Sequence, residues 1–433
     1  MLLDIYTDLF VSVFGSFGVV FRFWYIWSPF VLFPLARQTW LSWVRYKYIA
    51  SQNWTILEIQ MPRAIEKGPK AMEQALANLH GYRNDPGSWL EKYRDGEVTL
   101  WFSFELVSVA GNIRFFIHTP RQHKNGVEAN LYAQYPNIDI KEVPDYLEQL
   151  HPRTLPELYE QGRDLWGTEV MLDKEDHIPI RSYTEFESKD EFQNIDTMAS
   201  VLETLRSLGP GESAVMQIIA RPASNAWQKK GGEKVKEIKE KASSLKVSEE
   251  GASRVERSSP GDIQFLKLIE QKLIKPGFEV IIRLVYIADA AVFSSGSVRR
   301  GFMSILNQVG SDIYNKFAIN HKVSTLVQWV YYPYLFPKRR AEGRKSRLLR
   351  NLRERRVPAH DKVQGLYDSV MLSSGFAHRP FILNTEELAT IYHFPTQTVL
   401  TGPLLERQEA KRMGPPAGLP IFTDQDPSNI IPR

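Results

Sequence analysis

The sequence predicts an α+β protein, with an N-terminal transmembrane helix, two ferredoxin-like (βαββαβ) domains and a C-terminal helical and linker segment. Three observations predict it. Residues 9–35 are apolar with a single charge, Arg22. Apolar alternation and helical stripes then follow the order β-α-β-β-α-β in residues 51–150, and a related order returns in residues 151–330. Prolines recur through the tail, residues 401–433.

Residues 1–50 are predicted to be a membrane anchor, because a helix needs about 20 apolar residues to cross a bilayer. The apolar run is followed by aromatic and cationic residues expected at the membrane interface: Arg37, Trp40, Trp43, Arg45 and Lys47. We therefore expect a single pass through a bacterial inner membrane, with the C-terminal bulk in the cytoplasm. Two alternatives are a buried hairpin of a soluble domain, broken at Pro29 and Pro34, and a re-entrant pair of helices split at Arg22.

The first predicted domain, residues 51–150, alternates strand and helix signals. Leu100, Phe102 and Phe104 alternate with more polar neighbours, which is typical of a half-buried strand. Gly111 and the following asparagine suit a tight turn into the next strand. In chain order, the expected elements are strand 54–59, helix 69–80, strands 99–106 and 113–117, helix 119–135 and strand 138–140.

The second predicted domain, residues 151–330, reads as a diverged copy of the first in its element order. The expected elements are strand 178–180, helix 198–208, strands 214–220 and 278–288, and helix 298–309. The second of the middle strands is apolar on both faces, as a covered central strand would be. Residues 228–260 between those strands are rich in Lys, Glu, Ser and Gly, which predicts a mobile charged insertion with helix over 233–241.

Residues 331–400 hold a basic helix and a C-terminal segment. The candidate contacts to an anionic partner are Arg339, Arg340, Arg344, Lys345, Arg347, Arg350, Arg353, Arg355 and Arg356. They could neutralise nucleic-acid phosphates or bind anionic lipid. The third interpretation is a charged face that is solvated or paired with a protein partner. Further on, a strand at 381–383 precedes a helix at 386–393, where Asn384 and Glu387 predict a capping box.

Several stretches resemble one bacterial family, namely residues 57–63, 69–74, 79–81, 381–395 and 415–420. The chain resembles the membrane-anchored N-terminal region of conjugative-transfer, type IV secretion-like ATPases of the FtsK/HerA class. The stretch around 384–389 is the most specific, and the matching motif residues are Asn384, Glu386, Glu387 and His393. The resemblance implies an assembly platform whose partners are a DNA-translocating ATPase motor and further copies of the chain. The two α+β domains would supply the protein contacts, and the proline-rich tail would join the motor.

The sequence departs from this family in lacking the phosphate loop, since no G-x-x-x-x-G-K-[ST] occurs. It contains no cysteine, which excludes thiolate chemistry and disulfides. We therefore expect no catalytic residue, cofactor or metal, and a non-enzymatic, membrane-anchored assembly module of a DNA-transfer system. The alternative is a standalone membrane-associated protein that binds nucleic acid through residues 338–356. DNA or anionic lipid are the further partners that the net charge of +4 permits.

Overall fold

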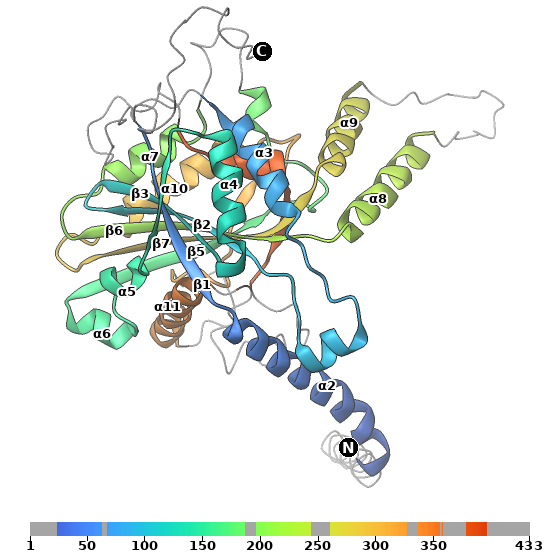
Figure 1. Ribbon diagram of the computed structural model, residues 1–433, viewed down its shortest axis with the longest axis horizontal. Helices are drawn as coiled ribbons and strands as arrows, with labels where there is room; N and C mark the ends of the chain where they lie inside the picture. The colour runs from blue at the N-terminus through green and yellow to red at the C-terminus, as the bar shows by residue number, and fades with distance from the viewer. Residues whose placement is uncertain are drawn as a thin grey trace, which may run out of the picture.

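The computed structural model describes residues 24–62, 67–186, 196–243, 260–326, 336–355, 357 and 378–395. One large antiparallel sheet lies between two layers of helices, and two helical projections extend from this body (Figure 1). The predicted tail, residues 401–433, and Arg356 lie outside the described residues.

Nine strands form one sheet within the described residues, in the order β4-β1-β3-β2-β6-β7-β5-β8, with β9 paired to β7. All the paired neighbours are antiparallel. The strands are β1 Trp54–Gln60, β2 Phe102–Val109, β3 Asn112–Pro120, β4 Asp139–Val143, β5 Arg163–Leu172, β6 Glu212–Pro222, β7 Gly277–Asp289, β8 Phe317–Ile319 and β9 Phe381–Asn384.

The predicted division into two separate ferredoxin-like domains is wrong, because the two halves share this sheet. β2 pairs with β6 along its whole length, from Phe102 opposite Ala220 to Val109 opposite Ser213. The strand order 4-1-3-2 of the first half recurs in the second as β8-β5-β7-β6, so repeated halves meet edge to edge. Periodicity shows which residues face a core, but it does not show that two strand edges will pair with each other.

The upper helical layer in Figure 1 covers both halves of the sheet and shares one hydrophobic core with it. Met72, Leu131, Leu205 and Phe302 contribute to this single cluster from four different helices. The helices are α3 Pro69–His80, α4 Lys124–Gln134, α7 Ala199–Arg206, α10 Ser295–Gln308 and α13 Thr385–Ile391. A core that crosses the boundary between halves makes the body one packed unit.

The opposite face of the sheet is covered by α5 Tyr146–Leu150, α6 Leu155–Glu160 and α11 Pro337–Glu354. The predicted basic helix is therefore confirmed as a helix. It packs closely because β5 carries Gly167 beneath it: a Cβ there would overlap Leu348 and lie 2.8 Å from the carbonyl oxygen of Leu284. Residues 99–106 are buried on both faces, rather than half-buried as predicted.

The charged insertion contributes a helical hairpin that projects from the body, formed by α8 Ala226–Ser243 and α9 Pro260–Ile274 (Figure 1). Val235 of α8 packs on Leu266 and Ile269 of α9 in a small cluster of its own. α8 covers the predicted helical stretch, whereas residues 244–259 lie outside the described residues.

The second projection is α2 Trp24–Ser51, a helix that extends away from the sheet (Figure 1). No helix in the described ranges combines the length and the apolar character that a bilayer crossing needs. This finding contradicts the predicted transmembrane helix and the single-pass inner-membrane location drawn from it. α2 carries Arg37, Arg45 and Lys47 within its length. Residues 9–23 of the predicted run lie outside the described residues.

Short elements complete the chain: the π-helix η1 Glu91–Asp95, and the 3-10 helices η2 Arg121–His123 and η3 Tyr183–Glu185. The helix expected from residue 119 begins five residues later, because Thr119 and Pro120 still pair with β1. The tight turn before β3 is confirmed, with Gly111 at φ +84°.

Candidate interaction surfaces

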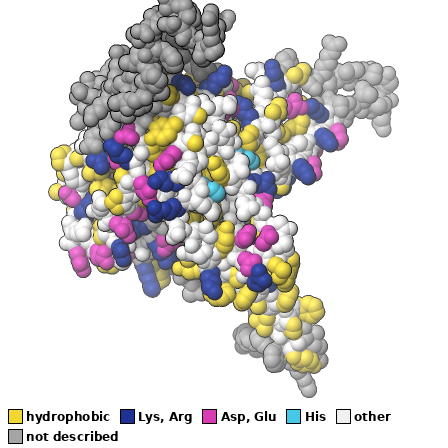
Figure 2. Space-filling model, in the orientation of Figure 1, with side chains coloured by type: hydrophobic (Ala, Val, Ile, Leu, Met, Phe, Trp, Pro, Cys, Tyr) yellow, Lys and Arg dark blue, Asp and Glu magenta, His cyan; other side chains and the backbone are white. Residues whose placement is uncertain are grey.

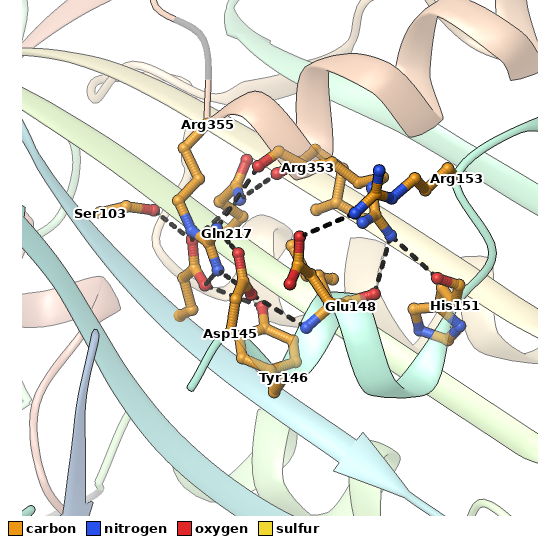
Figure 3. Close-up of polar contacts among 12 residues, drawn as sticks. Ser103, Asp145, Tyr146, Glu148, His151, Arg153, Gln217, Arg353 and Arg355 are labelled. Atoms are coloured by element: carbon orange, nitrogen blue, oxygen red, sulfur yellow. Dashed lines mark hydrogen bonds and ion pairs between the residues drawn. The ribbon is translucent and has the colours of Figure 1, made fainter. Parts of the chain in front are cut away.

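The basic helix α11 turns much of its charge into the protein. Arg344 is buried and donates hydrogen bonds to the carbonyl oxygens of His321 (3.0 Å) and Ser324 (2.9 Å). Arg353 donates to the carbonyls of Leu147 and His151, both at 2.8 Å, at the C-terminal end of α5 (Figure 3). Burial lowers the pKa of Arg344 to about 10. Both arginines therefore direct their donors to backbone oxygens of neighbouring segments of the same chain.

Arg355, directly after α11, is buried and binds two carboxylates, although it was predicted to contact an external anionic partner. Its guanidinium binds the Glu105 carboxylate twice, at 2.8 and 3.1 Å, and Asp145 twice, at 2.7 and 3.0 Å (Figure 3). Tyr146 donates its hydroxyl to Glu105 at 2.8 Å and lies under the guanidinium. Burial alone would lower the pKa of Arg355, but Glu105 and Asp145 outweigh it and raise that pKa.

Glu105 begins a row of polar side chains across four adjacent strands. In the sheet register, Glu105 lies opposite Gln217, Gln217 opposite Arg283, and Arg283 opposite Glu169. All four are essentially inaccessible to solvent. Gln217 donates to Glu105 at 2.9 Å, and Arg283 donates to Gln217 at 3.0 Å and to Glu169 at 2.8 Å. The row is a continuous hydrogen-bonded network inside an otherwise apolar layer.

The C-terminal end of α11 covers this row of side chains. Gln217 also donates to the carbonyl of Leu352 at 3.0 Å, and Arg283 donates to the carbonyl of Asn351 at 3.1 Å. Both carbonyls lie in the last turn of the helix, where the backbone N–H of Arg355 also donates to them. The positive guanidinium also suits the negative end of the helix dipole. The network therefore fixes α11 in one position on the sheet.

Glu169 ends the row against a histidine from the C-terminal segment. The Nδ1 atom of His378 lies 2.9 and 2.7 Å from the two carboxylate oxygens of Glu169. Burial raises the pKa of Glu169, but His378 and Arg283 outweigh that effect and hold it below its ordinary value. Every carboxylate in the row is held by a guanidinium, an arrangement that suits structural locking better than proton transfer.

The outward face of α11 carries both signs of charge. Residues spaced by four along the exposed stripe are Lys338, Glu342, Ser346, Arg350 and Glu354. Of the other candidate contacts, Arg339 is exposed, Arg340 and Arg347 are half-buried, and Lys345 forms an ion pair with Asp164. The structure therefore does not gather the predicted basic residues into one cationic surface.

The motif residues at the C-terminal end are structural. The predicted capping box is confirmed: Asn384 accepts from the Glu387 amide at 2.8 Å, and Glu387 accepts from the Asn384 amide at 2.9 Å. Glu387 also pairs with buried Lys272 at 3.0 Å, and Glu386 pairs with Lys275 at 2.5 Å. The buried His393 ring lies 3.0 Å from Asp196. These contacts attach β9 and α13 to the body.

α2 and the loop around η1 expose aromatic rings side by side. We define the aromatic platform as Trp40, Trp43 and Tyr46 of α2 with Trp89, Leu90 and Tyr93 at η1. Trp40 and Trp43 are each 50% exposed and Trp89 is 69% exposed. The ring centroids of Trp40 and Trp43 lie 5.2 Å apart, as do those of Trp89 and Tyr93. Figure 2 shows hydrophobic side chains gathered along the projecting α2.

Close packing holds the two parts of the platform together. The Nε1 atom of Trp40 donates to the backbone oxygen of Tyr93 at 2.6 Å. Gly96, at φ +69°, allows the loop to approach α2: a Cβ there would overlap the backbone of Val44. Leu41 and Val44 are buried on the inner side of the helix. The platform is thus a defined surface built from segments 53 positions apart in sequence.

Cationic side chains border the platform. The Arg37 guanidinium lies 5.3 Å from the Tyr93 ring centroid, and its Nε atom donates to the Tyr93 hydroxyl at 3.1 Å. Lys47 lies 5.0 Å from the Trp43 ring and Lys92 lies 5.7 Å from the Tyr93 ring. The residues predicted for a membrane interface therefore belong to this platform and its border, except Arg45.

Arg45 lines a cavity of ≈ 760 Å³ between α2, the start of α8 and the ends of β6, β7 and β9. Two of the carboxylates that line the cavity have partners: Glu279 binds Arg221, and Asp85 accepts a hydrogen bond from Thr99 at 2.6 Å. No cluster of three or more His, Asp or Glu side chains able to hold a metal ion occurs in the described ranges. The lining carries charges of both signs and favours no single ligand class.

The family model described as "Domain of unknown function (DUF8128)" matches residues 46–296, more than half of the chain. The chain belongs to the DUF8128 family. No curated protein matches the sequence. The DUF8128 region includes β1 to β7 and all four residues of the polar row, whereas α11 and β9 follow it.

The sequence pattern did not predict the residues that form the polar row or the η1 part of the aromatic platform. Glu105 and Gln217 were not singled out, although a charged or amide residue within an apolar strand signals a buried partner. Trp89 and Tyr93 lie between the predicted helix 69–80 and the predicted strand 99–106, where no element was expected. Three aromatic or large apolar residues within that short loop were the available clue.

Proposed function

We propose that this DUF8128 protein is a non-enzymatic assembly module that holds further copies of itself through the aromatic platform. The observation that carries the proposal is the exposure of large rings on a surface whose geometry is fixed by packing against the body. Contiguous apolar patches on proteins mark interaction sites. Tryptophan and tyrosine are also the residues that most often dominate the binding energy of interfaces.

The rest of the molecule supports a scaffold rather than an enzyme. The carboxylates of the polar row are bound to guanidinium groups and buried beneath α11. A general acid or base must reach a substrate, and these groups cannot. The rigid sheet instead provides a stable base from which α2 projects.

The resemblance of the sequence to conjugative-transfer ATPases supplies the proposed context. Such motors act as multi-subunit assemblies, so a subunit that associates with itself would position several copies around one motor. The association is the testable step, because it needs only this chain.

The test compares full-length chains by sedimentation velocity over a range of protein concentrations. Removing two exposed rings, Trp43→Ser with Trp89→Ser, should weaken association by at least about tenfold, which corresponds to about 1.4 kcal/mol. Ile313→Ser is the matched control, because Ile313 is an exposed apolar residue away from the platform. A wild-type chain that stays monomeric at every concentration, or a double variant that associates normally, would overturn the proposal.

A further inference from the structure

We infer that the aromatic platform binds the proline-rich segment 414–422 from the tail of a second copy, which joins copies head to tail. The inference rests on the proposed function and names the segment that the platform takes. It follows from three features: the ring chemistry of the platform, the composition of the tail and the length of chain that connects the tail to the body.

The platform offers the chemistry that proline-rich segments recognise. Such segments dock on exposed aromatic rings, with the ring faces against the proline rings. Trp43 and Trp89 present half or more of their side chains to solvent on neighbouring elements. The platform is also bordered by Arg37, Lys47 and Lys92.

The tail contains one segment of matching composition, Gly-Pro-Pro-Ala-Gly-Leu-Pro-Ile-Phe at 414–422. Its three prolines fix φ near −65°, so little backbone entropy is lost on binding. It carries no charge, and its apolar side chains suit exposed rings. Lys411 and Arg412 precede it and Asp424 and Asp426 follow it, so we place its acidic C-terminal flank beside the cations at the platform border.

The connection is long enough to reach another copy. The described chain ends at Pro395, so residues 396–413, eighteen residues, separate it from the segment. Fully extended, they span roughly 60 Å. α13 packs beside α3 on the upper layer, whereas α2 projects from the opposite end of the body (Figure 1). To reach the platform of its own chain, the tail would have to run past the whole body, whereas the platform of a neighbouring copy needs no such path. Head-to-tail contacts of this kind can close into a ring.

A crosslinking experiment tests the contact directly. Because the chain has no native cysteine, a label can be attached at one introduced cysteine alone. Leu419→Cys in the full-length chain is labelled with a maleimide benzophenone, and ¹⁴N and ¹⁵N preparations are mixed equally before illumination. We expect crosslinks from position 419 to peptides that contain residues 37–47 or 86–94. About half of these crosslinked pairs should join a ¹⁴N peptide to a ¹⁵N peptide, because the contact is between two chains. The same label at Val292→Cys, exposed on the body, is the control and should not reach those peptides.

Crosslinks to other surfaces, or platform crosslinks that only join a chain to itself, would overturn the inference. A second measurement separates it from the proposed function. Replacing Pro415, Pro416 and Pro420 by alanine should weaken association at least tenfold, as the tryptophan variant does. If the tryptophan variant loses association and the proline variant keeps it, the platform function stands and this inference fails. If neither variant changes association, both fail.

Discussion

The guanidinium of Arg355 closes on the carboxylate of Glu105 across 250 positions of the sequence, with donor–acceptor distances of 2.8 and 3.1 Å. Glu105 lies in the middle of β2, the strand through which the two halves of the sheet join. Arg355 directly follows the helix that covers that junction. One ion pair therefore links the junction strand to its cover.

Breaking this pair should destabilise the protein strongly. Arg355→Ala leaves the buried Glu105 charge without its main partner, and we expect a loss of about 3–5 kcal/mol in the free energy of unfolding. Urea denaturation measures it. Arg350→Ala, on the exposed stripe of the same helix, should change stability by less than about 0.5 kcal/mol. Equal small losses for both variants would show that the network is not what holds α11.

Stability should fall as the pH drops below about 6.5, and His151 contributes to the fall. Burial, followed by the charges of Arg163 and Arg353, lowers the pKa of His151 to about 3. In the unfolded chain it titrates near 6.5. Between those values the unfolded state binds more protons, so acid favours unfolding, by up to about 1.4 kcal/mol per pH unit.

His151→Phe should therefore flatten the plot of unfolding free energy against pH between 6 and 4, measured by urea denaturation at each pH. A His151 variant with an unchanged slope would contradict the assignment.

Gly167 decides how closely α11 approaches the sheet. Gly167→Ala would place a methyl group against Leu348 and the Leu284 carbonyl, and the strand backbone cannot move aside. We expect a cost of about 1–3 kcal/mol and faster amide hydrogen exchange in α11. Gly232→Ala in α8 meets no atom within 4 Å and should be neutral or slightly stabilising. Unchanged exchange in α11 would show that the helix has room.

The structure changes which arginines can be substituted to test the nucleic-acid alternative. Arg344 and Arg353 bind backbone oxygens, so replacing them would test stability rather than DNA binding. Arg339 and Arg350 are exposed and suitable for substitution. Because the outer stripe of α11 alternates in sign, we expect no steeply salt-dependent binding of duplex DNA in fluorescence anisotropy. Salt-dependent binding that Arg339→Ala with Arg350→Ala abolishes would favour the alternative.

Local signals in the sequence predicted many elements correctly. The proline at 69 and the glycine at 81 bracket α3, and Asn384 with Glu387 forms the capping box of α13. The leucine stripe within the basic segment predicted a helix, and Leu348 and Leu352 do face the core. Such features depend on residues within a few positions of each other, where short-range geometry decides the structure.

Other expectations failed where a partner lies far along the chain. The apolar run 9–35 predicted a membrane crossing, yet the part of it that the structure describes belongs to α2, which packs on η1. No helix of the described residues is long and apolar enough to cross a membrane. The cationic pattern of α11 predicted an anionic partner, yet Arg355 finds its carboxylates on β2 and beside α5. Composition records which charges are present, but not whether the fold supplies their counter-charges.

The sequence by itself determined many of the element types, the capping box at Asn384 and the absence of cysteine chemistry, because each depends on local composition or spacing. The strand expected at 178–180 does not form, and its place in the second half is taken by β5. Only the tertiary structure decided that the halves share one sheet, that the basic helix is a cover held by a buried network, and that aromatic rings from α2 and η1 form one surface. Strand edges and buried charges choose their partners by three-dimensional proximity, which a single sequence does not record.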